Sequence, residues 1–176
     1  MSKIFIGVGS NLGDRAGYLE FAKKELLSVA GLTNLRCSPV YETEPMAAEG
    51  GLFLNAVWSF ETDFSPEDLL KKIQEIEAKA NRQQNKSNEA RTLDLDILFY
   101  GDQVIRELGI TVPHPRLHER AFVLMPFCDL EPEFIHPVLK KTIRELLNNL
   151  HFGKRGTGNV KQIRSTFPGD RSPKEK

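Results

Sequence analysis

The feature that most constrains the fold is the strict alternation of apolar and polar residues over residues 92–97. A β-strand sends successive side chains to opposite faces of its sheet, so this alternation predicts a strand. Three aliphatic residues would share one face, and Asp94 and Asp96 would share the other. The chain is therefore expected to form a sheet with one buried face and an acidic pair on the opposite face.

The acidic pair suggests a metal site. Asp94 and Asp96 would stand roughly 6.5–7 Å apart, from a strand rise of about 3.3 Å per residue. At that distance two carboxylates repel by about 2.4 kcal/mol for an effective dielectric constant near 20. A divalent cation turns this repulsion into attraction, and hard oxygen ligands favour Mg²⁺ shared with substrate phosphates. The alternative is a solvated strand face, but aspartate is rare in strands and the spacing favours the metal site.

The order of predicted elements indicates the fold class. Two strand–helix–strand units form an α+β ferredoxin-like sandwich, in which an antiparallel sheet carries both helices on one face. The C-terminal part adds further helices. The predicted strands cover residues 3–9, 33–42, 52–62 and 91–100, with a short one near 103–105. Two predicted helices begin after Asp14 and after Ser65. Two more are predicted in the C-terminal part, over about residues 119–130 and 142–150.

Polar and aromatic residues are expected on the uncovered face of this sheet. Alternation in the third strand puts Phe53 and Asn55 opposite its core-facing residues, on the side of the acidic pair. Arg120 lies near the start of a predicted helix, where the dipole disfavours a cation, which suggests that it binds an anion. The glycines of residues 7–13 lack dinucleotide-loop spacing and predict a turn that a ligand can approach.

Composition predicts one soluble globular domain. The chain has 176 residues, of which 40% are apolar and 27% charged. Residues 153–176 carry a net charge of +5 and predict a basic, disordered tail after a domain over residues 1–152. The remainder is acidic, which argues against nucleic acid as a partner, and no apolar run is long enough for a membrane span. Isolated Cys37 and Cys128, and a start without signal-peptide features, suggest the cytoplasm.

Five segments carry motifs that occur together in one enzyme family. They are Ile-Gly-Val-Gly-Ser-Asn-Leu-Gly at 6–13, Tyr-Glu-Thr-Glu-Pro at 41–45, Phe-Leu-Asn at 53–55, Arg-Thr-Leu-Asp-Leu-Asp-Ile at 91–97, and His-Pro-Arg-Leu-His-Glu-Arg-Ala-Phe-Val-Leu at 114–124. In this order the chain closely resembles the 6-hydroxymethyl-7,8-dihydropterin pyrophosphokinase family of folate biosynthesis. The arginine-to-double-aspartate segment is the most specific of the five.

The resemblance implies that ATP donates pyrophosphate to the hydroxymethyl group of the pterin and leaves as AMP. It implies two Mg²⁺ ions on Asp94 and Asp96, which form the catalytic set with Arg82 and Arg91. The ATP site it implies consists of Gln74, Glu77, Arg82, Arg91, Ile97, Thr111, His114 and Arg120. The pterin site it implies consists of Thr43, Pro45, Phe53, Asn55 and Phe122.

One segment departs from the family pattern. Many members carry an Arg-Trp-Gly-Pro-like segment before the aspartate motif, whereas residues 83–90 lack Trp and Pro and have Lys86 as their basic residue. Two alternatives stay open: a catalytically weak pterin- and nucleotide-binding homologue, and a two-metal nucleotidyl transferase or nuclease with a ferredoxin-like palm. The sequence indicates no obligate protein partner.

Overall fold

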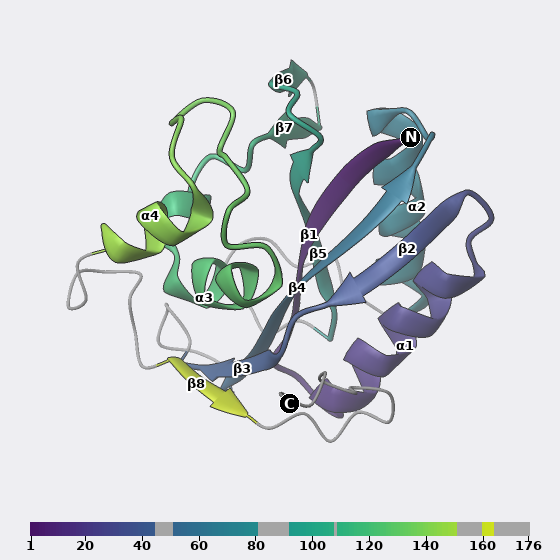
Figure 1. Cartoon of the computed structure of the whole chain (residues 1–176). Helices are drawn as coiled ribbons and strands as arrows, with labels where there is room; N and C mark the ends of the chain where they lie inside the picture. The colour runs from purple at the N-terminus through teal and green to yellow at the C-terminus, as the bar shows by residue number, and fades with distance from the viewer. Residues whose placement is uncertain (45–50, 81–91, 108, 151–159, 164–176) are drawn as a thin grey trace, which may run out of the picture.

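The structure, a computed structural model, describes residues 1–44, 51–80, 92–107, 109–150 and 160–163. An antiparallel sheet lies between two pairs of helices in this part of the chain (Figure 1). The α+β class and the antiparallel sheet are as the sequence predicts. None of the described helices is both long and apolar enough to cross a membrane.

The main sheet has the strand order that two strand–helix–strand units produce. Among the described residues it has six strands in the order β5-β1-β4-β3-β8, and β2 also pairs with β4. All of the pairings are antiparallel. The strands are β1 (Ser2–Ser10), β2 (Leu32–Cys37), β3 (Val40–Thr43), β4 (Phe53–Thr62), β5 (Asp94–Tyr100) and β8 (Val160–Ile163).

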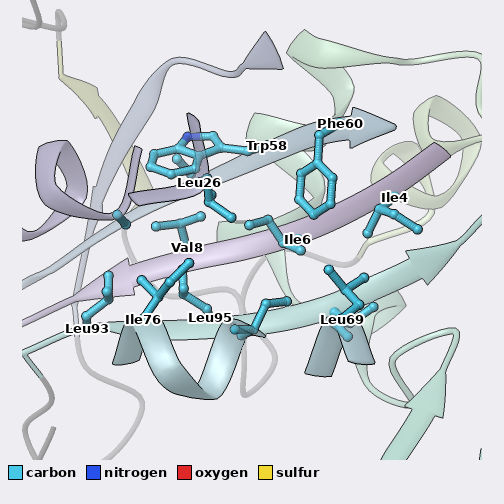
Figure 2. Close-up of a cluster of buried hydrophobic side chains, with 14 of the residues drawn as sticks. Ile4, Ile6, Val8, Leu26, Trp58, Phe60, Leu69, Ile76, Leu93 and Leu95 are labelled. Atoms are coloured by element: carbon cyan, nitrogen blue, oxygen red, sulfur yellow. The ribbon is translucent and has the colours of Figure 1, made fainter. Parts of the chain in front are cut away.

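The first face of the sheet is covered by α1 (Arg15–Ser28) and α2 (Pro66–Lys79). Both helices begin as predicted, because the side chains of Asp14 and Ser65 accept hydrogen bonds from backbone N–H groups of the first turn. Figure 2 shows the aliphatic and aromatic side chains that fill this layer. They include Ile4, Ile6, Val8, Leu26, Trp58, Phe60, Leu69, Ile76, Leu93 and Leu95.

Among the described residues, α3 (Ala121–Leu130) and α4 (Ile143–Asn148) cover part of the second face. Figure 1 shows these helices on the side of the sheet opposite to α1 and α2. Beneath them lies an aromatic cluster with neighbouring ring centroids 4.6–6.2 Å apart, formed by Phe5, Phe99, Phe127 and Phe134. The prediction of an uncovered face is therefore wrong for the part of the sheet beneath this cluster.

Some predicted elements are wrong in extent. The strand predicted over residues 33–42 is divided between β2 and β3 at Ser38, because Pro39 has no backbone N–H for the ladder. The strand predicted near 103–105 is β6 (Ile105–Glu107), and it pairs with β7 (Ile110–Val112), which the sequence did not predict. A 3₁₀ turn at Leu117–Glu119 precedes α3, and Arg120 is the N-cap residue of α3.

The basic tail is not wholly disordered. Residues 160–163 form β8, which pairs with β3 in the register Val40–Ile163. The prediction of disorder is therefore wrong for these four residues. It is based on the polar composition of the tail, and composition does not show that a segment pairs with a distant strand. The rest of the tail lies outside the described residues, and the domain boundary at 152 stays a prediction.

Candidate active site

The aspartates lie together on the second face of the sheet, as predicted. On β1, Gly9 pairs with Asp94 and Gly7 pairs with Asp96. Gly9 also pairs with Asn55 of β4 on its other side. Because paired residues share a face, Asp94, Gly9 and Asn55 form a row across three strands. The acidic residues and the predicted pterin amide thus lie on one surface.

The middle of that row has no side chain. A Cβ atom at Gly9 would lie 3.3 Å from Oδ1 of Asn55, closer than nine in ten Cβ contacts in proteins. The glycine therefore keeps a shallow floor open between Asp94 and Asn55. The predicted turn follows this strand, since Gly7 and Gly9 lie inside β1 and Gly13 has a positive φ of 68° in the turn.

The amide of Asn55 is held by a buried partner. Its Nδ2 donates to Oγ1 of Thr43 at 2.8 Å, and both side chains are buried. This bond fixes the plane of the amide at the edge of the floor. Phe53 lies two residues earlier on the same face and is half-buried. Phe122 stands at the start of α3, where the guanidinium of Arg120 lies 5.7 Å from its ring centroid.

A bulge in β5 brings the basic residues to the aspartates. Leu98 has no partner on β1, because the register shifts between the Phe5–Phe99 and Ile6–Ile97 pairs. The backbone N–H of His114 donates to the carbonyl oxygen of Leu98 at 3.0 Å. This bond anchors the segment that carries His114 beside the acidic end of the strand.

His114 and Arg120 present two N–H donors side by side. Burial, and then the charge of Arg120, lower the pKa of His114 to about 4, so the ring is neutral at pH 7. Its Nδ1 accepts from the backbone N–H of Arg116, which leaves the proton on Nε2. That nitrogen lies 3.5 Å from Nη1 of Arg120. Two adjacent donors of this kind suit a bound anion.

Arg120 links this pair to the carboxylates. Burial lowers the pKa of Arg120, while the nearby charges of Asp96 and Asp94 act in the opposite direction. An arginine stays protonated even so, because its pKa in water is above 12. Its Nε is buried without a hydrogen-bond partner in the described part of the chain. Asp94, Asp96, His114 and Arg120 therefore form one electrostatic cluster.

The donor set fits Mg²⁺ that is shared with phosphates. Among the described residues, no group of three or more His, Cys, Asp or Glu side chains is placed to hold a metal. Mg²⁺ is usually bound through one or two carboxylates, with water and substrate phosphates completing its octahedron. Asp94 and Asp96, partly exposed on one strand face, meet that requirement.

Other predicted nucleotide residues lie away from the aspartate face. Glu77 is buried on α2, and its Oε1 accepts from the backbone N–H of Leu95 at 2.8 Å, between the two aspartates in sequence. Ile97 is buried in the layer between the sheet and the helices. The structure thus gives Glu77 a positioning contact at the edge of β5.

Gln74 and Thr111 are both exposed, on neighbouring elements. A Cβ atom at Gly109 would lie 3.7 Å from Cδ2 of Leu70, so the β6–β7 hairpin lies against α2. Leu70 is one turn before Gln74 on the same face of that helix. The predicted nucleotide residues therefore divide into a phosphate group at the aspartates and a second group between α2 and β7.

Three predicted site residues, Pro45, Arg82 and Arg91, lie outside the described residues. The described residues on either side of 81–91 are joined, because Oγ1 of Thr92 donates to the carbonyl oxygen of Ala80 at 3.0 Å. Both lie at the end of α2 that Glu77 ties to β5.

Sequence reasoning missed Arg15. Its Nη1 donates to the carbonyl oxygen of Leu52 at 2.6 Å and its Nη2 to Oε2 of Glu42 at 3.0 Å. A signal was present, because Arg15 occupies the first turn of α1, where the dipole disfavours a cation. The same signal pointed to Arg120.

Several known proteins are similar to this chain in sequence. The sequence model of "7,8-dihydro-6-hydroxymethylpterin-pyrophosphokinase (HPPK)" matches residues 5–132. A curated 2-amino-4-hydroxy-6-hydroxymethyldihydropteridine pyrophosphokinase from Aquifex aeolicus is 37% identical over 82% of this chain and 90% of its own length. The enzyme of the same name from Bacillus subtilis is 39% identical over 72% of this chain and 76% of its own.

The fold has solved relatives as well. The structure of Plasmodium falciparum HPPK-DHPS matches 84% of this chain with a TM-score of 0.64 at 18% sequence identity. This chain spans 43% of that longer chain, so the likeness concerns the shared fold. The sequence model and the curated relatives cover most of the chain and agree with the fold. The chain therefore belongs to the 7,8-dihydro-6-hydroxymethylpterin-pyrophosphokinase family, the pyrophosphokinases of folate biosynthesis.

Proposed function

We propose that the aspartate face of the sheet carries out the reaction of the family, the transfer of pyrophosphate from ATP to 6-hydroxymethyl-7,8-dihydropterin. The observation that carries this proposal is the row formed by Asp94, Gly9 and Asn55. It joins a carboxylate pair suited to phosphate-bound magnesium to an amide suited to a pterin edge. Between them, the glycine leaves room for the hydroxymethyl group to reach a phosphate.

The phosphate half consists of the carboxylates and the two donors beside them. Asp94 and Asp96 would hold two Mg²⁺ ions with ATP, and these ions supply charge neutralisation and positioning. Arg120 and neutral His114 donate hydrogen bonds to phosphate oxygens. Arg82 and Arg91 are proposed to complete this half, because they lie two residues after Ala80 and one residue before Thr92, which are joined by a hydrogen bond.

The pterin half lies at the opposite end of the row. Asn55 offers both a donor and an acceptor to the heteroaromatic edge, and Thr43 holds the amide in place. Phe53 and Phe122 are proposed to stack on the ring faces, each contributing about 0.5–1.5 kcal/mol beyond the area buried. Pro45 is proposed to border the same pocket.

The reaction needs positioning more than covalent chemistry by the protein. The hydroxymethyl oxygen of the pterin forms a bond to the β-phosphorus of ATP. The bond from that phosphorus to the oxygen bridging it to the α-phosphate breaks, so AMP leaves and the hydroxyl proton is released. Arg120 and His114 stabilise the phosphate charge during this transfer.

The remaining inferences concern partners and setting. We infer that ATP, the pterin and Mg²⁺ suffice for the reaction, without a protein partner or nucleic acid, because the folded part is acidic and the row contains both half-sites. The cytoplasm is the setting proposed for the chain.

The decisive measurement is AMP formation with the full chain. AMP should form from ATP and Mg²⁺ only when 6-hydroxymethyl-7,8-dihydropterin is present, in a one-to-one ratio with the pyrophosphorylated pterin. Asn55→Ala should weaken pterin binding in calorimetry and leave ATP binding nearly unchanged. Binding of both substrates without AMP formation would instead favour a catalytically weak binding homologue.

A further inference from the structure

A single guanidinium spans the two ends of the β3–β4 connection. Arg15 donates to Oε2 of Glu42, the residue before Thr43, and to the carbonyl oxygen of Leu52, the residue before Phe53. Thr43 and Phe53 are themselves paired in the sheet. Arg15 thus touches both chain ends at the positions that adjoin two residues of the proposed pterin half.

The backbone at Arg15 is fixed from its own side. Gly13 has a positive φ of 68°, and the side chain of Asp14 accepts from the backbone N–H of Gly17 at 3.0 Å. The N–H of Arg15 donates to the carbonyl oxygen of Gly13 at 3.0 Å. The guanidinium is therefore presented from a capped helix start, whose position is set by α1 rather than by the connection it holds.

The chemistry of the contact requires arginine. The planar guanidinium offers several N–H donors in a rigid fork, so it reaches a carboxylate and a carbonyl together. Lysine carries a compact charge without this fork. The side chains of Arg15 and Glu42 are 31% and 27% exposed, so solvent weakens the contribution of the pair to global stability. A local effect on geometry can then be separated from unfolding.

We propose that Arg15 is a positioning residue for the pterin half-site, holding Thr43 and Phe53 at the spacing that the substrate ring requires. The inference rests on the proposed pterin site. Arg15 does not contact the reacting atoms; it acts through Glu42 and Leu52. Its loss should therefore affect pterin binding more than ATP binding.

The chain contains a matched control for this contact. Arg36 also donates to one carboxylate and one carbonyl, Oε2 of Glu131 at 3.1 Å and the oxygen of Leu130 at 3.2 Å. It stands on β2, in register with Ser59 and away from Asp94 and Asn55. Arg36→Gln removes the same kind of contact without reaching the proposed site.

The test compares Arg15→Gln, Arg15→Lys and Arg36→Gln in the full chain. Arg15→Gln should raise the KM and the calorimetric Kd for the pterin about tenfold, with KM for ATP and the melting temperature nearly unchanged. Arg15→Lys should raise the KM and Kd for the pterin less than Arg15→Gln does. Arg36→Gln should leave these constants and the KM for ATP unchanged. An equal rise in both KM values, or the same profile for Arg15→Gln and Arg36→Gln, would overturn the proposal.

Two further variants separate this inference from the proposed site. Glu42→Gln should weaken pterin binding, and the double variant with Arg15→Gln should lose little more than either single change. Full additivity would contradict the contact. If Asn55→Ala leaves pterin binding intact while Arg15→Gln weakens it, Asn55 is not part of the pterin site, and the role of Arg15 in holding Thr43 and Phe53 stands. The reverse result leaves the site standing and removes the role of Arg15.

Discussion

The second face of the sheet has two halves built on the same strands but from different residues. In the aromatic half, Phe5 and Phe99 pack with rings from α3 and the segment after it. In the aspartate half, the same two strands carry Gly7, Gly9, Asp94 and Asp96 instead. One half buries large apolar side chains. The other has glycines, which leave an open surface beside two carboxylates of like charge. The comparison indicates that stability and chemistry are placed in separate parts of one surface.

The largest effect should come from the aromatic half. Phe127 is fully buried, so Phe127→Ala should lower the free energy of unfolding by about 3–5 kcal/mol through lost burial and a cavity. The folded fraction should keep its KM for the pterin. Half-buried Phe53, changed to Ala as the matched control, should show the opposite pattern. Chemical denaturation and steady-state kinetics on both variants provide the measurement. Equal losses of stability would contradict the division of this face into a stabilising half and a functional half.

The next effect should come from the carboxylates. Asp96→Asn should slow AMP formation by about 10²–10³, because magnesium stabilisation of phosphoryl transfer amounts to several kcal/mol. Its melting temperature should change little, since the substitution removes both the repulsion from Asp94 and an attraction to Arg120. Exposed Asp102 in the following turn, changed to Asn, is the control and should keep full activity. Near-normal turnover of the Asp96 variant would refute its assigned role.

The floor between the two half-sites can be narrowed by one methyl group. Gly9→Ala places a Cβ 3.3 Å from Oδ1 of Asn55, so the amide must move and pterin affinity should fall about tenfold. At Gly7 the same change meets Cδ2 of Leu98 at an ordinary 3.6 Å. The Gly7 variant should therefore bind the pterin nearly as well as the unmodified chain. Calorimetric titration distinguishes the two; identical Kd values would show that the floor does not border the ring.

The smallest effect concerns acid sensitivity of the aromatic half. His136 lies edge-on to Phe99 with ring centroids 5.2 Å apart, and burial, followed by the charge of His118, lowers its pKa. The unfolded chain therefore binds a proton more readily, with a pKa near 6.5. The stability associated with neutral His136 is present above that pH and is lost as the pH falls below it towards the folded-state pKa.

His136→Asn is the control for this titration. The Nδ1 of His136 accepts from the N–H groups of Val138 and Leu139 at 3.2 and 3.1 Å, and an asparagine oxygen can replace that acceptor. Below pH 6.5, the free energy of unfolding should therefore fall less steeply with decreasing pH in the variant than in the unmodified chain. An unchanged slope in denaturation at several pH values would exclude a contribution from His136.

Local patterns were sufficient for much of the fold. The alternation around Asp94 placed both carboxylates on one face, and Asp14 and Ser65 marked the starts of two helices. These features depend on neighbours within a few residues, which a sequence displays directly. Two pairs of the site residues that the family motifs imply are in contact, Asn55 with Thr43 and His114 with Arg120.

Features that depend on distant partners could not be predicted. The pairing of β8 with β3, the contacts of Arg15, and the bond from Leu95 to Glu77 each join residues that no local pattern relates. The aromatic cover of the second face was also hidden, because the rings of α3 look the same in sequence as those of any buried helix. Tertiary contact decides such features.

The bulge at Leu98 has a consequence for what this chain tolerates. It is an extra residue in β5, so positions before it and after it point to the second face with opposite parity: Asp94 and Asp96 on one side, Phe99 on the other. Deleting Leu98 would restore simple alternation with Asp94, Asp96 and Phe99 all still on the second face. The deletion would instead remove a buried side chain of the aromatic half and the carbonyl oxygen that accepts from the N–H of His114. Shortening this strand by one residue should therefore weaken both halves without turning either one to the other face.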